Sequence, residues 1–106
     1  VAATVERGEY CMSKTALSMA ARLFAIRMAP HGVGVYEVQP GIILTEMTAP
    51  AKAKYDALIA DGMLVEPRWG TPEDVARVVR SMAAGLLPYT VGQEVRVDGG
   101  LLLKRF

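Results

Sequence analysis

The chain has 106 residues, of which 52% are hydrophobic, and its 12 basic and 11 acidic residues leave a formal net charge of +1. This length makes one small domain or part of a larger one, and the apolar content is high for a free-standing domain of this size. The basic residues are dispersed, which argues against a nucleic-acid partner, and no apolar run approaches the roughly 20 residues of a membrane span.

The single cysteine, Cys11, excludes an internal disulfide and favours a reducing cytoplasm. Cys11 and the single histidine, His31, are too few to form a metal cluster, so we predict no metal site. His31 lies just beyond an expected helix end, where a partly charged imidazole complements the helix dipole.

The first expected element is a long helix over about residues 9–28, a segment without Gly or Pro and rich in Ala, Leu and Met. Pro30 and Gly32 are expected to end it. Residues 32–40 are mostly apolar and β-branched, which predicts a buried parallel strand broken by Pro40-Gly41.

Residues 45–62 are more polar and predict one or two short, exposed helices. Residues 70–85 contain the residue types typical of both ends of a helix. Thr71 is the expected N-cap, Pro72 lies in the first turn, and Gly85 is expected to end the helix. Residues 93–100 alternate into a short strand and a turn. The order strand, loop, helix, strand points to a right-handed parallel crossover, hence an α/β fold.

The first helix carries two apolar stripes. At 100° per residue, one stripe contains Leu17, Ala21, Phe24 and Met28. The other lies well round the cylinder and contains Met12, Ala16, Met19, Leu23 and Ile26. A helix that is apolar on two sides needs two partners, and we expect the sheet of its own subunit and a second subunit. Tyr10 and Lys14 fall on the first stripe, so they are expected to face the ligand-bearing edge of the sheet.

Three motifs occur in order along the chain: Tyr-x-x-x-Lys at Tyr10 to Lys14, Pro-Gly-x-Ile-x-Thr at Pro40 to Thr45, and Val-Asp-Gly-Gly at residues 97–100. Their order resembles the C-terminal half of the short-chain dehydrogenases/reductases, most closely the subgroup related to 3-oxoacyl-acyl-carrier-protein reductases. The resemblance implies the C-terminal half of a Rossmann-type, doubly wound parallel sheet. Residues 1–106 would then be the catalytic half of one domain, with the N-terminal dinucleotide-binding half absent from this chain.

The same resemblance implies an oxidoreductase that transfers a hydride between NAD or NADP and a small carbonyl/alcohol substrate, with 3-oxoacyl compounds as one class. It gives Tyr10 the role of general acid/base, and gives Lys14 the tasks of tuning Tyr10 and binding the nicotinamide ribose, so both border the cofactor. The chemistry agrees, because a phenol with a pKa near 10 is a poor acid/base at neutral pH and a nearby ammonium lowers that pKa. Taken alone, the two residues are better interpreted as a solvated side-chain pair of no consequence.

Pro40-Gly41 turns the chain at the carboxyl end of a parallel strand, where such sheets bind ligands. By resemblance, the backbone of Ile43 holds the nicotinamide carboxamide, and the Thr45 hydroxyl contacts the carboxamide or the diphosphate. The alternatives are an ordinary turn at Pro40-Gly41 and a helix cap at Thr45 before Glu46. Among the other residues, Trp69 is interpreted as the base of a lid or as an interface aromatic.

The family's Gly-rich phosphate loop and catalytic serine have no counterpart here and would lie upstream of Val1, and the chain contains no Asn. We therefore interpret the chain as a fragment of a dehydrogenase or as a decayed remnant of one. We expect no useful turnover from these 106 residues alone. One alternative is a non-catalytic module that dimerises through the second stripe; a sugar epimerase or dehydratase fits the last two motifs less well. The second stripe and the family both favour a homodimer or homotetramer.

Overall fold

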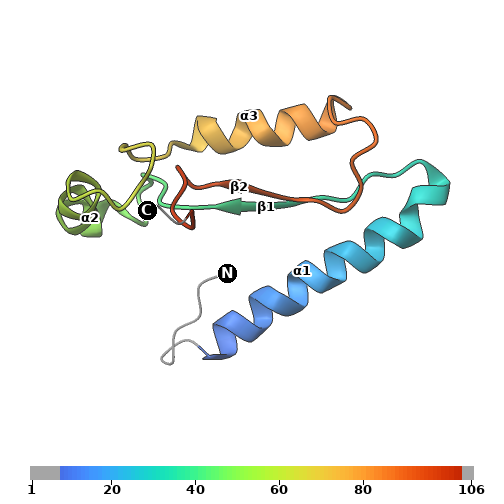
Figure 1. Ribbon diagram of the computed structural model, residues 1–106, viewed down its shortest axis with the longest axis horizontal. Helices are drawn as coiled ribbons and strands as arrows, with labels where there is room; N and C mark the ends of the chain where they lie inside the picture. Colours follow the sequence, from blue (N-terminus) through green and yellow to red (C-terminus); the bar gives the residue numbers. More distant parts are fainter. Residues whose placement is uncertain (1–7, 104–106) are drawn as a thin grey trace. The chain divides into compact units, whose positions relative to one another are not determined.

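The computed structural model describes residues 8–103, with side chains from residue 12 onward. In chain order it contains α1 (Gly8–Met28), η2 (Ala29–His31), β1 (Glu37–Pro40), η3 (Ala49–Ala51), α2 (Lys52–Ala60), α3 (Pro72–Ala83) and β2 (Glu94–Val97) (Figure 1). Within this part of the chain, no helix has both the length and the apolar character needed to cross a membrane.

The two strands form a parallel sheet, as the sequence predicted. β1 and β2 are neighbours (Figure 1), and the N–H groups of Glu37 and Gly41 donate to the carbonyls of Gln93 and Val97. The partner numbers rise together along both strands, which is the pattern of a parallel pair. The fold is therefore α/β.

The chain forms two compact units. Among the described residues, the first unit contains residues 8–37 and 87–95, and the second contains residues 38–86 and 96–103. Each strand has residues in both units, because the division passes through β1 and β2.

In the first unit, α1 packs through small side chains. Ala25 is 2% exposed, and a Cβ added to Gly92 would lie 3.1 Å from the Ala25 Cβ, so helix and loop approach closely. The Arg22 guanidinium forms an ion pair with Glu94. The helix ends as predicted, since Gly32 takes the left-handed conformation (φ 71°) and its N–H donates to the carbonyl of Ala29.

Two details of the first unit differ from the predictions. β1 begins at Glu37 rather than at residue 32, because its partner β2 starts only at Glu94, after Gly92 (φ 64°) has turned the chain. The first predicted stripe of α1 is packed only in part, since Ala21 and Met28 are half-buried whereas Leu17 and Phe24 are 56% and 59% exposed. The close approach of Gly92 to Ala25 leaves room there only for a small side chain.

In the second unit, Ile59 and Leu64 are buried, and α2 and α3 form where short helices and a capped helix were predicted. α3 starts with a capping box. The Thr71 hydroxyl accepts from the N–H of Asp74 at 3.2 Å, and the Asp74 carboxylate accepts from the N–H of Thr71 at 2.7 Å. This pair satisfies two of the N–H groups that a helix start leaves without partners.

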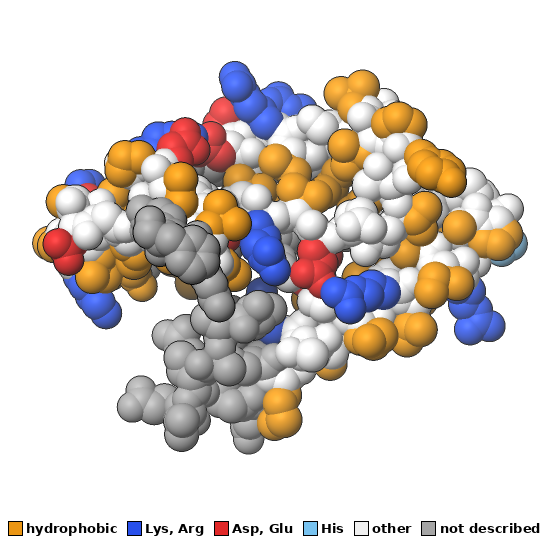
Figure 2. All heavy atoms as spheres, in the orientation of Figure 1, with side chains coloured by type: hydrophobic (Ala, Val, Ile, Leu, Met, Phe, Trp, Pro, Cys, Tyr) orange, Lys and Arg blue, Asp and Glu red, His pale blue; other side chains and the backbone are white. Residues whose placement is uncertain are grey.

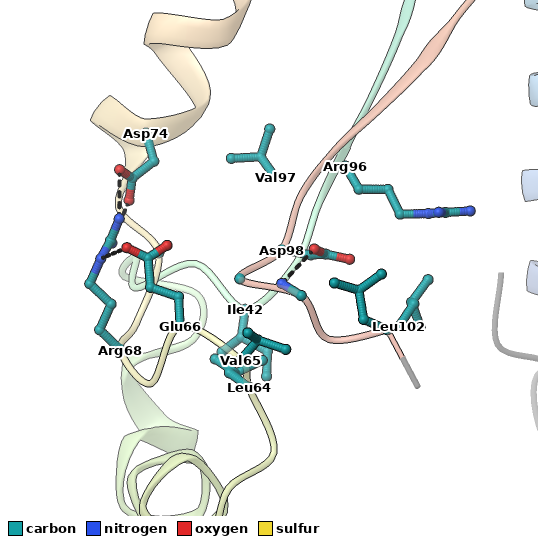
Figure 3. A pocket seen from close by; sticks show the side chains of 14 residues that line it. Ile42, Leu64, Val65, Glu66, Arg68, Asp74, Arg96, Val97, Asp98 and Leu102 are labelled. Atoms are coloured by element: carbon teal, nitrogen blue, oxygen red, sulfur yellow. Dashed lines mark hydrogen bonds and ion pairs between the residues drawn. The ribbon is translucent and has the colours of Figure 1, made fainter. Parts of the chain in front are cut away.

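Arg68, which precedes α3 in the chain, binds the carboxylate of Asp74 in the first turn of that helix. Its guanidinium donates to both oxygens of Asp74, at 2.8 and 3.1 Å, and lies 3.3 Å from Glu66 (Figure 3). The hydrogen bonds from Arg68, followed by the one from the Thr71 N–H, hold the pKa of Asp74 well below its usual range. Asp74 therefore stays ionised in mildly acidic solution.

Replacing Asp74 by Asn should lower the free energy of unfolding by an amount that depends on pH. Because the pKa of Asp74 is depressed in the folded state, its ionised form stabilises the fold fully above the unfolded-state pKa of about 3.9, and this contribution is lost as the pH falls further. Urea unfolding at pH 7 and pH 3 should therefore show a larger difference between wild type and D74N at pH 7. The control E66Q removes the longer contact of Arg68 and should have less effect; an equal D74N deficit at both pH values would contradict the assignment.

Candidate functional site

The predicted catalytic pair lies at the N-terminal end of α1. The side chain of Tyr10 is outside the described residues, so its geometry with Lys14 stays a prediction. Lys14 is exposed, and its carbonyl accepts from the hydroxyl of Ser18 at 3.2 Å. The same hydroxyl lies 2.8 Å from Oε1 of Glu37, at the start of β1. Ser18, which is 8% exposed, thus ties the helix turn that carries Lys14 to the strand.

Pro40 is the last residue of β1 and Gly41 follows it, both in the second unit. The Gly41 N–H donates to the carbonyl of Val97 at 2.9 Å. A Cβ on Gly41 would lie 2.7 Å from both Cα and Cβ of Asp98, a separation that real Cβ atoms essentially never show. Glycine is therefore required for the Pro-Gly motif and the Val-Asp-Gly-Gly motif to meet.

Ile43 has a backbone orientation suited to a ligand. The N–H of Gly70 donates to the carbonyl of Ile42, and the N–H of Leu44 donates to the carbonyl of Gly70, both at 2.9 Å, so Ile43 and Gly70 form a parallel bridge. In such a bridge the N–H and C=O of Ile43 point away from Gly70. An amide ligand needs one acceptor and one donor. The N–H of Ile43 can donate to it, and the C=O of Ile43, which already accepts from the Thr48 hydroxyl at 2.7 Å, has a second lone pair for an amide N–H.

Thr45 belongs to a threonine-rich turn, which sequence reasoning missed. The hydroxyl of Thr48 accepts from the N–H of Thr45 at 2.8 Å, lies 3.4 Å from the Thr45 hydroxyl, and donates to the carbonyl of Ile43 at 2.7 Å. The interpretation of Thr45 as a cap before Glu46 is wrong, because residues 46–48 form a turn and the next helix, η3, has Thr48 at its N-cap position. Only the Thr-x-x-Thr spacing could have indicated this.

The predicted cofactor-contacting residues of the second unit therefore lie in one continuous segment. The strand end at Pro40-Gly41 is held by Val97 and Asp98, Ile43 by Gly70, and Thr45 by Thr48. Tyr10 and Lys14 belong to the first unit.

A cavity of about 580 Å³ opens beside this segment, within the second unit. Apolar side chains line much of it, including Ile42, Leu64, Val65 and Leu102 (Figure 3). Arg68 and its two carboxylate partners border the cavity, and Asp98 accepts from the N–H of Gly100 at 3.0 Å. This volume lies in the range of small-molecule pockets.

Comparison with known proteins places the chain in a family. Residues 2–102 match the family described as enoyl-(acyl carrier protein) reductase. A dehydrogenase named OXI1 from Cochliobolus heterostrophus is 34% identical over 101 residues, which cover 91% of this chain and 44% of that protein. The 3-oxoacyl-[acyl-carrier-protein] reductase FabG of Rickettsia felis is 32% identical over 97 residues, or 92% of this chain and 40% of that protein.

Solved structures show the same fold. The crystal structure of a 3-oxoacyl-[acyl-carrier protein] reductase from Brucella melitensis in complex with NAD is 40% identical, with a TM-score of 0.90 over 99% of this chain and 42% of that one. A protein from Agrobacterium tumefaciens with bound NADP is 27% identical, with a TM-score of 0.81 over 92% of this chain and 40% of that one. The likeness confirms the predicted Rossmann-type α/β fold.

The chain spans less than half the length of each of these relatives. The family match nevertheless covers nearly all of its residues, and the motifs at Pro40 to Thr45 and at residues 97–100 meet in the structure. The chain belongs to the enoyl-(acyl carrier protein) reductase family of short-chain dehydrogenases/reductases, and within it resembles the 3-oxoacyl-[acyl-carrier-protein] reductases.

Proposed function

We propose that the protein carrying this chain is a cytoplasmic, NAD- or NADP-dependent oxidoreductase that interconverts a carbonyl compound and its alcohol, with 3-oxoacyl thioesters as the substrate class. The family membership supports the reaction type, and relatives solved with NAD and with NADP support the cofactor. The observation that carries the proposal is the backbone of Ile43. Its N–H and C=O face away from the bridge to Gly70, at the carboxyl end of a parallel strand.

The residues of the second unit fit a nicotinamide ring. The N–H and C=O of Ile43 can bond the carboxamide, and the Thr45 hydroxyl lies in the next turn, where it can bond the carboxamide or the diphosphate. Gly41 keeps this segment against Asp98, because any side chain there would collide with that backbone. When bound, the cofactor supplies or accepts the hydride.

Proton transfer is assigned to the first unit. Tyr10 donates the proton that the reduced carbonyl oxygen needs, and recovers it in the reverse direction. Lys14 lies one helical turn away, where its ammonium favours the phenolate and can also bond the nicotinamide ribose. Ser18 and Glu37 fix the turn of α1 that carries Lys14.

Deuteride transfer tests the proposal. The purified protein is incubated with NADH or NADPH deuterated at the transferred position and with a 3-oxoacyl thioester, and the product is analysed by mass spectrometry. We expect deuterium on the alcohol carbon of the product. The 106 residues alone should give no useful turnover, because the family's Gly-rich loop and catalytic serine are not among them. An alcohol product without deuterium would refute direct hydride transfer.

We also infer that the protein is a homodimer or homotetramer that pairs through α1. Four large members of the second stripe, Met12, Met19, Leu23 and Ile26, are 51% to 69% exposed. Hydrophobic side chains are frequent at the surface in Figure 2. A contiguous apolar stripe of this kind marks an interface, and a two-fold axis lets one stripe meet its copy around the small Ala16.

Replacing Ala16 and Leu23 together by Glu should shift the protein from oligomer towards monomer in sedimentation velocity. The substitutions place like charges on both sides of the proposed axis, where burial makes their repulsion costly. The control is Ser13→Glu, which adds a negative charge to an exposed position of α1 about 100° round the helix from Met12 and outside the stripe. A double variant of Ala16 and Leu23 that sediments like wild type would mean that another face forms the oligomer.

A further inference from the structure

Residues 44–69 form an excursion of the chain that begins after Ile43 and returns to it at Gly70. The bridge between Ile43 and Gly70 closes this excursion at its base. A Cβ at Gly70 would lie 2.5 Å from Cδ1 of Ile43 and 3.2 Å from the carbonyl oxygen of Ile42, so a side chain there would require the Ile43 side chain to move. The excursion contains α2 (Lys52–Ala60). The position of α2 relative to Ile43 therefore depends on how the helix is attached to the residues just before Gly70.

Few interactions within α2 stabilise this helix. It has nine residues and no side-chain cap, and Ile59 is its one buried side chain. Helices of this length are marginal unless other parts of the protein stabilise them. A contact that anchors the middle of α2 should therefore influence its position strongly.

Trp69 supplies that contact. Its indole N–H donates to Oδ1 of Asp56 at 2.7 Å, while Lys52 donates to Oδ2 of the same carboxylate at 2.7 Å. The rings of Trp69 and Tyr55 meet edge to face, with centroids 5.7 Å apart. These bonds from Lys52 and Trp69 lower the pKa of Asp56, so its carboxylate is an ionised acceptor at neutral pH. Hydrogen bonds to ionised groups are stronger than neutral ones.

We propose that Trp69 is a positioning residue for the substrate side of the site: its indole N–H holds Asp56 and so fixes α2 relative to the segment of Ile42–Leu44. We call this pair the Trp69–Asp56 clasp. The role rests on the proposed function, because Ile43 marks the nicotinamide end of the site only if that assignment holds. The carbonyl substrate must lie beside the nicotinamide, and Leu64, Val65 and Glu66, which follow α2 in the same excursion, line the cavity beside Ile42. A displaced α2 should therefore disturb this cavity and weaken substrate binding more than cofactor binding.

The first arm of the test measures α2 directly, by the rate of trypsin cleavage after Lys54 under native conditions. Cleavage of a folded protein follows the population in which the local structure is open. Trp69→Phe keeps an aromatic ring beside Tyr55 and removes the N–H donor, and Asp56→Ala removes the acceptor. Each should raise the cleavage rate about fivefold, and the double variant no more than Asp56→Ala alone, since both substitutions remove the bond between the indole and Asp56. Lys52→Gln is the matched control, because it leaves the indole bond in place, and it should cleave within about twofold of wild type.

The second arm measures steady-state reduction of a 3-oxoacyl thioester. Trp69→Phe and Asp56→Ala should raise KM for the thioester about tenfold, with the cofactor Kd within about twofold of wild type. Wild-type cleavage rates in both variants would overturn the clasp, and an unchanged KM despite faster cleavage would overturn its positioning role. If the wild-type protein transferred no hydride, the proposed function and the positioning role would both fail, while the trypsin rates would still decide whether the clasp holds α2.

Discussion

Replacing Tyr10 by Phe is expected to lower kcat for carbonyl reduction by about 100- to 10,000-fold in the protein that carries this chain. The substitution removes the phenolic proton donor and keeps the ring, so the reduced carbonyl oxygen loses its source of a proton. The cofactor Kd should change little, because the assigned carboxamide contacts come from Ile43 and the ribose contact from Lys14.

Stopped-flow reduction and cofactor titration of Tyr10→Phe measure the two effects separately. Tyr36→Phe is the matched control in the same unit, since the Tyr36 hydroxyl donates to the carbonyl of Thr90 at 2.8 Å and has no assigned part in the chemistry. Tyr36→Phe should keep wild-type kcat. If Tyr10→Phe retained more than about a tenth of wild-type kcat, Tyr10 would not be the general acid/base.

Helix boundaries were predictable from the sequence because they depend on neighbouring residues. Gly32 ends α1 and its 3-10 extension through a left-handed conformation, and Thr71 with Asp74 starts α3, as their residue types predict. The end of β1 at Pro40 was predictable for the same reason. These features need no knowledge of what packs against them.

Features that depend on a distant partner were not predictable in the same way. The length of β1 depends on where β2 begins, and the packed face of α1 depends on the close approach of Gly92 to Ala25. Periodicity correctly located apolar side chains on α1, but it could not tell which of them a small-residue contact would leave exposed.

In the candidate site, too, features that depend on neighbouring residues were predictable and features that depend on a distant partner were not. The motifs identified Pro40, Gly41, Ile43 and Thr45, which lie in one continuous segment. The groups that hold this segment, Gly70 and Thr48, were missed, because only the folded chain places Gly70 beside Ile43. The bond between Trp69 and Asp56 crosses thirteen residues and was also missed.

The central claim is that the backbone of Ile43 binds the nicotinamide carboxamide. Substitution of Ile43 by proline removes the N–H that this binding needs. Because this N–H points away from Gly70, Ile43→Pro should leave both bridge hydrogen bonds in place while deleting the proposed donor. Ile43→Val is the matched control, because it changes the side chain and keeps the N–H. Circular dichroism and the thermal midpoint check that both variants remain folded.

Titration of NADH and NADPH into these variants, followed by nicotinamide fluorescence, is the most direct test of the central claim. We predict that Ile43→Pro raises the cofactor Kd at least about tenfold, as expected for the loss of one well-formed hydrogen bond and its alignment, whereas Ile43→Val stays within about twofold of wild type. A folded Ile43→Pro variant that binds the cofactor as tightly as wild type would contradict the claim that this backbone holds the nicotinamide.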